Sequence, residues 1–302
     1  MKCPKCNFVN QAGSKFCSHC GTSLANVCAR CSTKNIPMDA KFCPNCGTLL
    51  KEEKEVPKTS TCTNVISDKK GIGKFSISPT KQVTFSRGNL RYNRKMNIWS
   101  FAENQYDCLG STNMQENTLG DIIDLFGWGL GNVHGTEDDV FFSDWGQHKI
   151  GSNPTYLWRT LSNQEWRYLI EERRNAKSLI GIAQVAGVNG LILLPDNWMN
   201  NEVNFVPGGH YSNDKMGFAF HQDYSKDQWM KMQDKGAVFL PAAGFCERIN
   251  LEKFQERGYY WTSTPLRQPY GSIYFSFSPN FIDTYHGIPR TARCSVRLVK
   301  NI

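Results

Sequence analysis

Apolar and polar positions divide the chain near residue 73. From residue 74 onward, short apolar segments alternate with turns rich in Gly, Asn, Pro and Ser, a pattern typical of short antiparallel strands. The segments that we predict as strands are 74–77, 82–85, 98–101, 191–194, 237–240, 259–262, 272–276 and 295–299. The Val188-Asn189-Gly190 signal predicts a turn that leads into the strand 191–194.

Two segments carry helix signals instead. The first begins at Ser162, with Glu165 completing a capping box, and we expect it to end near Asn175. The second begins at Ser225 and ends near Gly236. Two helices among many strands predict an α+β domain over residues 74–302, dominated by antiparallel strands.

Residues 51–73 are charged and polar, and they predict a linker. In residues 1–50, the spacing of the cysteines is the informative pattern. Eight of the twelve cysteines form four Cys-x-x-Cys pairs, namely Cys3 with Cys6, Cys17 with Cys20, Cys28 with Cys31, and Cys43 with Cys46. Two residues between cysteines let a tight turn aim both thiolates at one ion, and two such pairs complete the tetrahedral sulfur shell that Zn²⁺ prefers.

An internal repeat supports this interpretation, because residues 15–24 return in similar form as residues 41–50. The sequence therefore predicts two zinc ribbons, at 1–24 and 25–50, each holding one structural Zn²⁺ through its own four cysteines. Few apolar residues are available per ribbon, so metal binding must supply the folding free energy, roughly 10–16 kcal/mol. Disulfides would need an oxidising compartment, and thioredoxin-type redox pairs lie within a βαβ pattern that is absent here, so both fit worse. Iron would use the same ligands.

Composition and charge bear on the cellular compartment of the protein and on the partners of the ribbons. The N-terminus enters a Cys-x-x-Cys pair at once, without the apolar run of a secretory signal, and no stretch reaches the roughly 20 apolar residues of a membrane span. With reduced zinc thiolates, this favours a cytoplasmic protein, although export without a signal peptide stays open. Residues 1–58 carry nine Lys/Arg against four Asp/Glu. The basic ribbons could contact a protein partner or nucleic acid.

Aromatic residues make up 12% of the chain and often stand beside glycine. We expect the tryptophans to be core residues rather than ligand platforms, because large rings bury much apolar area per residue.

A series of motifs along residues 72–302 resembles a known family. The motifs are Asn104-Gln105-Tyr106-Asp107, Asp124-Leu125-Phe126-Gly127-Trp128-Gly129, Trp158-Arg159-Thr160-Leu161, Gly190-Leu191-Ile192-Leu193-Leu194-Pro195, Gly236-Ala237-Val238-Phe239-Leu240-Pro241-Ala242-Ala243-Gly244, Tyr260-Trp261-Thr262-Ser263-Thr264 and Ser295-Val296-Arg297-Leu298-Val299. They resemble a large paralogous family of gut Bacteroidales-type bacteria, similar to the formylglycine-generating-enzyme branch of the C-type lectin fold. The resemblance implies paired first and last strands, two helices flanking the sheet, and a binding face built from C-terminal loops.

Some members of this fold class are variable proteins of diversity-generating retroelements, in which adenine-directed mutagenesis rewrites a C-terminal stretch. Between Thr262 and Leu298 this chain has no Lys, Glu, Met or Trp. Codons derived from AAC or AAT cannot encode those four residues, whereas Gln268 cannot come from such a codon and would have to be fixed. Active diversification and an ordinary β-rich terminus are both compatible with this composition.

The resemblance also raises an enzymatic alternative, because the formylglycine-generating relatives oxidise a substrate cysteine with copper held by two cysteines. A Cu(I) site needs two converging thiolates. This chain offers Cys294 near its end and Cys246 almost fifty residues earlier, and the sequence leaves open whether they meet. We therefore expect no catalytic residues, with a metal-dependent oxidase acting on a peptide as the alternative.

The segment 267–290 has the composition of a protein-binding surface, because Tyr and Arg offer contact area and hydrogen bonds while Ser, Gly and Asn adapt to shape. The candidate ligand-binding residues are Arg267, Tyr270, Tyr274, Asn280, Phe281, Asp283, Tyr285, His286 and Arg290. Of these, we expect Tyr270, Tyr274, Asn280, Asp283, Tyr285 and Arg290 to form an exposed patch. The sequence thus favours a recognition protein that binds a protein or peptide ligand.

Overall fold

The chain divides into two compact units, Met1–Val65 and Ile66–Ile302, which are described separately. The computed structural model describes residues 73–114, 122–129, 142–199, 203–208, 222–247, 250–266 and 271–302, and in the first unit residues 14, 18–20, 25–26 and 36–37. In the first unit, β1 (Ala25–Asn26) pairs antiparallel with β2 (Ile36–Pro37).

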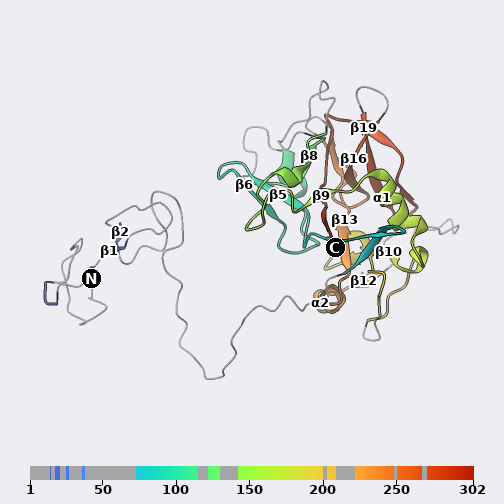
Figure 1. Ribbon diagram of the computed structural model, residues 1–302, viewed down its shortest axis with the longest axis horizontal. Coiled ribbons are helices and arrows are strands. Elements are labelled where there is room, and N and C mark those ends of the chain that lie inside the picture. Colours follow the sequence, from blue (N-terminus) through green and yellow to red (C-terminus); the bar gives the residue numbers. More distant parts are fainter. Residues whose placement is uncertain are drawn as a thin grey trace. The chain divides into compact units, whose positions relative to one another are not determined.

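The second unit is built mostly from short strands (Figure 1). One sheet has the order β12–β10–β11–β13, from Asp223–Tyr224, Ile180–Val185, Val188–Leu193 and Val238–Pro241. A second has the order β16–β17–β18 with β19 also paired to β17, from Gly258–Pro265, Gly271–Ser278, Phe281–Asp283 and Gly287–Pro289.

The described residues of the unit form three further sheets. The first and last strands of the unit belong to one sheet, β3–β4–β21–β9, from Phe75–Ser78, Lys81–Phe85, Leu298–Asn301 and Arg159–Thr160. Another has the order β15–β14–β20–β8, from Asn250–Glu252, Phe245–Glu247, Arg293–Cys294 and Phe126–Gly127. The last is β6–β5–β7, from Ile98–Phe101, Leu90–Asn93 and Ile122–Ile123.

Helices are few and short among the described residues. The two α-helices are α1 (Asn163–Arg167) and α2 (Lys226–Asp234), and the π-helical turn η3 (Tyr168–Glu172) continues α1. Single 3₁₀ turns are η1 (Gly110–Met114), η2 (Trp145–Gln147) and η4 (Ala176–Ser178). In Figure 1, α1 lies beside the β16 region and α2 beside β12, and residue contacts agree with both placements.

The helix starts agree with the sequence prediction. Both capping boxes are present: the Ser162 side chain accepts from the backbone N–H of Glu165, and Ser225 accepts from Gln228. The first helix is shorter than expected, because its π-helical turn ends at Glu172. The second ends just before Gly236, whose φ of 92° lies in the left-handed region that glycine adopts without strain.

The predicted turn at Val188-Asn189-Gly190 is wrong. These residues begin β11, and the turn lies two residues earlier at Ala186 and Gly187, whose φ values are 53° and 81°. Two successive left-handed residues make the tight turn that matches the twist of a hairpin. The favourable Asn-Gly pair instead lies within a strand, where Gly190 has the backbone oxygen of Leu240 within 2.4 Å of the place a Cβ would occupy.

The C-terminal strand also differs from the prediction. Residues 295–299 do not form one strand, because pairing stops after Cys294 and resumes at Leu298. The last strand, β21, pairs with β4, which separates it from β3. The break between the strands lets Ser295 pair with Tyr260 and Val296 accept from the Leu90 N–H.

Aromatic rings fill the core as expected. Trp128, Trp145, Trp166, Trp229 and Trp261 are all fully buried. One cluster packs α1 against the hairpin β16–β17, where the Trp166 and Phe275 rings stack with centroids 4.2 Å apart. Stacked rings of this kind contribute roughly 0.5–1.5 kcal/mol beyond their buried area.

A buried arginine forms a hydrogen-bond network that connects segments of the second unit that are distant in sequence. Arg297 is 1% exposed and donates to the side-chain oxygens of Asn89 and Gln105. Asn89 in turn donates to the Tyr260 hydroxyl, which donates to the backbone oxygen of Pro241. Burial lowers the pKa of Arg297 to about 10, so the side chain stays charged at neutral pH. Among the described residues, side-chain amide oxygens rather than a carboxylate accept the hydrogen bonds of this charge.

Replacing Arg297 with Ala is expected to lower the free energy of unfolding of the second unit by roughly 3–5 kcal/mol. The substitution leaves a cavity, leaves the buried Asn89 Oδ1 without its donor, and removes one of the two donors to Gln105 Oε1. Urea unfolding followed by tryptophan fluorescence measures this. The exposed Arg174 provides the matched control, and Arg174→Ala should change stability by less than about 0.5 kcal/mol. Equal effects of the two substitutions would show that the buried network carries no special weight.

Candidate functional site

The C-terminal hairpin β16–β17 positions the predicted binding segment. All eight residues of β17 are buried, because ring clusters cover both faces of the strand. Phe275 and Phe277 pack on the side of α1 and Trp166, whereas Tyr274 packs with Tyr259 on the other side. A strand covered on both faces offers no exposed side of its own, so any surface must come from the turns that flank it.

Of the residues predicted to form an exposed patch, two are buried and Asp283 is half-buried, so the prediction is wrong for the two buried ones and only partly right for Asp283. Tyr274 is 8% exposed, with its ring centroid 5.2 Å from that of Tyr259. Arg290 is 4% exposed, stacks on the Trp128 ring at 4.7 Å and donates from Nε to the backbone oxygen of Gly271. Both side chains support the hairpin from within.

The remaining described candidates lie at the two ends of β18. Asn280 is exposed and Phe281 half-buried at the β17–β18 turn, whereas Tyr285 and His286 are exposed in the β18–β19 loop. The half-buried Asp283 orders this loop, because its carboxylate accepts from the Tyr285 N–H at 2.9 Å and contacts the His286 ring. The predicted binding residues Arg267 and Tyr270 lie outside the described residues.

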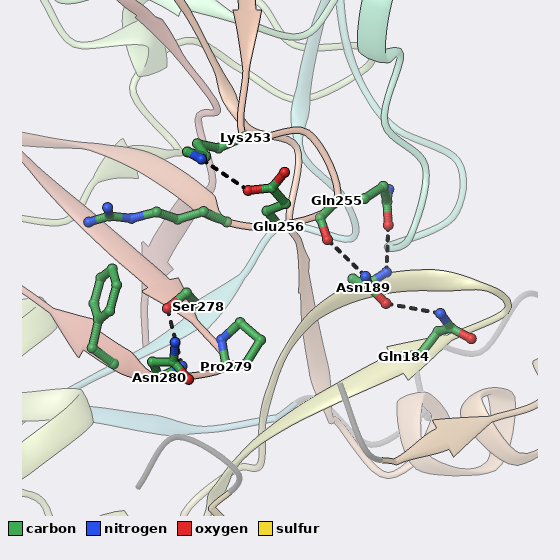
Figure 2. Close-up of a pocket in the computed structure, with 10 residues that line it drawn as sticks. Gln184, Asn189, Lys253, Gln255, Glu256, Ser278, Pro279 and Asn280 are labelled. Atoms are coloured by element: carbon green, nitrogen blue, oxygen red, sulfur yellow. Dashed lines mark hydrogen bonds and ion pairs between the residues drawn. The ribbon is translucent and has the colours of Figure 1, made fainter. Parts of the chain in front are cut away.

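A pocket of about 750 Å³ opens beside the β17–β18 turn (Figure 2). Three chain segments line it: the β10–β11 hairpin, the connection from β15 to β16, and the β17–β18 turn. The lining residues are Gln184, Asn189, Lys253, Gln255, Glu256, Arg257, Ser278, Pro279, Asn280 and Phe281. Its size falls within the range of small-ligand sites.

Hydrogen bonds fix one side of the pocket. Figure 2 shows Asn189 and Gln255 facing each other: the Asn189 N–H donates to Gln255 Oε1, and Asn189 Nδ2 donates to the Gln255 backbone oxygen, both at 2.8 Å. Gln184 Nε2 donates to Asn189 Oδ1 at 2.9 Å. Lys253 and Gln255 have φ values of 57° and 61°, a left-handed conformation that costs on the order of 1–3 kcal/mol per non-glycine residue and often marks functional sites.

Arg257 supplies a cation in this pocket. Its guanidinium lies 4.2 Å from the centroid of the Phe281 ring and 4.7 Å from that of Tyr259. One guanidinium nitrogen donates to Ser276 Oγ at 3.1 Å, and Nε is buried without a hydrogen-bond partner. Stacking on two rings holds a guanidinium in a fixed plane.

Sequence reasoning found Asn280 and Phe281 but missed most of the pocket. The missed residues are Gln184, Asn189, Lys253, Gln255, Glu256, Arg257, Ser278 and Pro279. They come from segments more than ninety residues apart, from Gln184 to Pro279, so no local pattern joins them. The charged pair Glu256-Arg257 directly before the aromatic start of β16 is the signal that could have drawn attention to the pocket.

Burial also restricts which positions of the C-terminal stretch could be rewritten. Phe275 and Phe277 are fully buried in the core, so diversification there would cost several kcal/mol per substitution. Exposed positions such as Asn280, Tyr285, His286 and Thr291 could change without loss of core packing.

The late cysteines lie on neighbouring strands without converging. Cys246 pairs in register with Arg293, so Cys294 points to the opposite face of the β14–β20 pair. Cys246 packs with Leu125 and Ala243, whereas Cys294 belongs to the cluster that contains Trp261. Burial raises the pKa of the Cys246 thiol to about 11 and that of Cys294 well above its ordinary value. Two protonated thiols on opposite faces fit poorly as a pair of Cu(I) ligands.

Comparison with known families identifies two parts of the chain. Residues 3–47 match the double zinc ribbon family, and residues 220–299 match a domain of unknown function (DUF8237). The second match extends from the region of α2 to β21 and includes the exposed candidate residues Asn280, Tyr285 and His286. No curated protein and no solved structure matches the chain.

The predicted double zinc ribbon is thus confirmed, and its family indicates zinc binding. Four Cys-x-x-Cys pairs provide the thiolate donors that Zn²⁺ prefers. Among the described residues, no helix is long and apolar enough to cross a membrane.

The structure describes one of the eight predicted zinc ligands. Cys20 is partly exposed, and its neighbours Ser18 and His19 are exposed in the same turn. The other seven predicted ligands lie outside the described residues: Cys3, Cys6, Cys17, Cys28, Cys31, Cys43 and Cys46. Two ions per chain, and the assignment of four cysteines to each ion, therefore stay predictions.

Removing zinc is expected to unfold the ribbons without affecting the second unit, because the two units are separately compact. Metal analysis of the purified chain should give two zinc ions. After treatment with a strong chelator, limited proteolysis should cleave within residues 1–50, while the thermal unfolding midpoint of the second unit stays unchanged. A shift of that midpoint on chelation would instead indicate that the two units depend on each other.

The buried thiols are expected to resist alkylation in the native protein. Burial raises the pKa of Cys246 from 9.0 to about 11, which at pH 8 lowers its thiolate fraction roughly 100-fold. Iodoacetamide labelling followed by mass spectrometry should therefore modify Cys246 and Cys294 at least that much more slowly in the native chain than in urea. Rapid native labelling of either cysteine would reopen the possibility of a reactive thiol.

Proposed function

We propose that this protein is a non-enzymatic recognition protein. The second unit, with the C-type lectin fold that its motifs suggest, presents a surface for a protein or peptide ligand, and the double zinc ribbon serves as an adaptor. The observation that carries the proposal is the contrast along the C-terminal hairpin. Its strand β17 is buried on both faces, whereas the adjoining turns expose Asn280, Tyr285 and His286 and border a pocket.

This arrangement favours recognition because the contact residues stand on a rigid support. Binding loses affinity when side chains and loops must be ordered, and a preordered surface avoids part of that cost. The Asp283 contacts order the loop that carries Tyr285 and His286. Tyrosine at an exposed position, 75% exposed here for Tyr285, is among the residues that most often dominate binding energy.

The alternative of a metal-dependent oxidase gains no support from the thiols. Cys246 and Cys294 are buried in different clusters, and a nucleophilic or metal-binding cysteine needs its thiolate form. A reducing cytoplasmic location agrees with a zinc site built from thiolates, and we include it in the proposal.

The proposal is tested with arrays of immobilised peptides and folded proteins probed with the zinc-loaded full-length chain. Spots bound by the wild type should lose at least about tenfold of their signal with the double variant Asn280→Ala/Tyr285→Ala. The matched control, Glu171→Ala/Arg174→Ala, changes two residues that are also exposed and should retain binding. Absence of any bound spot, or equal binding by both double variants, would contradict recognition through this surface.

A further inference from the structure

We propose that the pocket beside the β17–β18 turn binds a carboxylate group attached to an apolar group, with Arg257 as the anion-binding residue. The inference rests on the proposed recognition function and names the chemistry that one part of the surface selects. The observation behind it is a ring-stacked guanidinium in a pocket where the side chains of Asn189, Lys253 and Glu256 already have partners.

The available hydrogen-bond donors point to Arg257. Asn189 uses its N–H, Nδ2 and Oδ1 in hydrogen bonds to Gln255 and Gln184. These polar groups therefore fix the shape of the pocket. Lys253 Nζ is paired with Glu256 at 3.2 Å. The Arg257 guanidinium donates to a neutral hydroxyl, that of Ser276, and has no carboxylate partner among the described residues.

The local charge favours a monoanion. Lys253 and Glu256 offset each other, which leaves the single positive charge of Arg257 in the pocket. A carboxylate carries one negative charge and matches the planar fork of a guanidinium. A phosphate group carries between one and two charges at neutral pH and would leave part of its charge unmatched.

Apolar surface beside the cation provides a contact for the apolar group of the ligand. Pro279 and Phe281 line the pocket next to Arg257, and the Phe281 ring packs against its guanidinium. The volume of about 750 Å³ leaves room for an aromatic or branched aliphatic group together with the carboxylate. This chemistry is offered by a free organic acid, by the C-terminal residue of a peptide, and by an internal acidic side chain beside an apolar one.

The probes are 3-phenylpropionate and its neutral analogue 3-phenylpropionamide, titrated into the full-length zinc-loaded chain by calorimetry or by NMR. The wild type should bind the acid at least about tenfold more tightly than the amide, because a charged hydrogen-bonded pair is lost in the amide. Arg257→Gln should abolish this preference. Arg174→Gln, which removes the same charge from an exposed site, should leave it intact.

Three further probes separate the sources and the anion class. Acetyl-phenylalanine carries a terminal carboxylate, acetyl-Phe-Asp-amide carries an internal one, and phenyl phosphate carries a phosphate. Tighter binding of one peptide than of 3-phenylpropionate assigns the pocket to that type of chain, and equal binding of all three acids assigns it to the carboxylate alone. Tighter binding of phenyl phosphate than of every acid overturns the proposal.

The acid–amide comparison needs no variant, so it holds even where Arg257→Gln weakens folding. Equal affinity for acid and amide, no binding of either, or a preference that survives Arg257→Gln also overturns the carboxylate assignment. Array binding through Asn280 and Tyr285 without any acid preference would remove only this inference. An acid preference without array binding would instead remove macromolecular recognition and leave a small-molecule site.

Discussion

The second unit depends on a charge buried at its centre. Arg297 stands between the last two strands, and its guanidinium donates to Asn89 and Gln105 near the start of the unit. The same Gln105 accepts from the Phe239 N–H of β13, and Asn89 reaches Tyr260 of β16. Strands β13 and β16, which belong to two different sheets, therefore meet in one network with the connecting segments that carry Asn89, Gln105 and Arg297. A buried charge is costly unless its hydrogen bonds are satisfied, so the network requires these segments to be in place together.

This requirement reaches the candidate site through β16. Tyr260 anchors the middle of that strand to β13, and Trp261 donates to the backbone oxygen of Phe126 on β8 at 2.6 Å. With β16 fixed, β17 is clamped between two ring clusters and holds the turns that carry Asn280 and Tyr285. The core clusters on both faces of β17 thus fix the position of the turns. The exposed side chains of Asn280 and Tyr285 could be replaced without loss of core packing.

The sequence predicted the features that depend on short-range interactions along the chain. The capping boxes at Ser162 and Ser225 and the buried tryptophans follow from short-range hydrogen bonding and from ring size. The turn at Ala186 and Gly187 was missed, because pairing with β10 through Asn189 and with β13 from Gly190 onward continues the strand through an Asn-Gly pair that usually turns. Tyr274 and Arg290 were expected outside because one face of a strand was assumed to be open. Only the tertiary structure shows that a second cluster covers that face.

The pocket could not be predicted for a related reason, because it forms where three segments that are distant in sequence meet. Its shape also requires backbone conformations that are strained. Lys253 and Gln255 adopt left-handed conformations that the bonds between Asn189 and Gln255 stabilise. Such strain is tolerated where the surroundings determine the conformation strongly. The same connection places Arg257 against Phe281, so the proposed carboxylate would meet a cation whose position is already fixed. The backbone strain and the fixed position of this cation are therefore two consequences of one backbone arrangement.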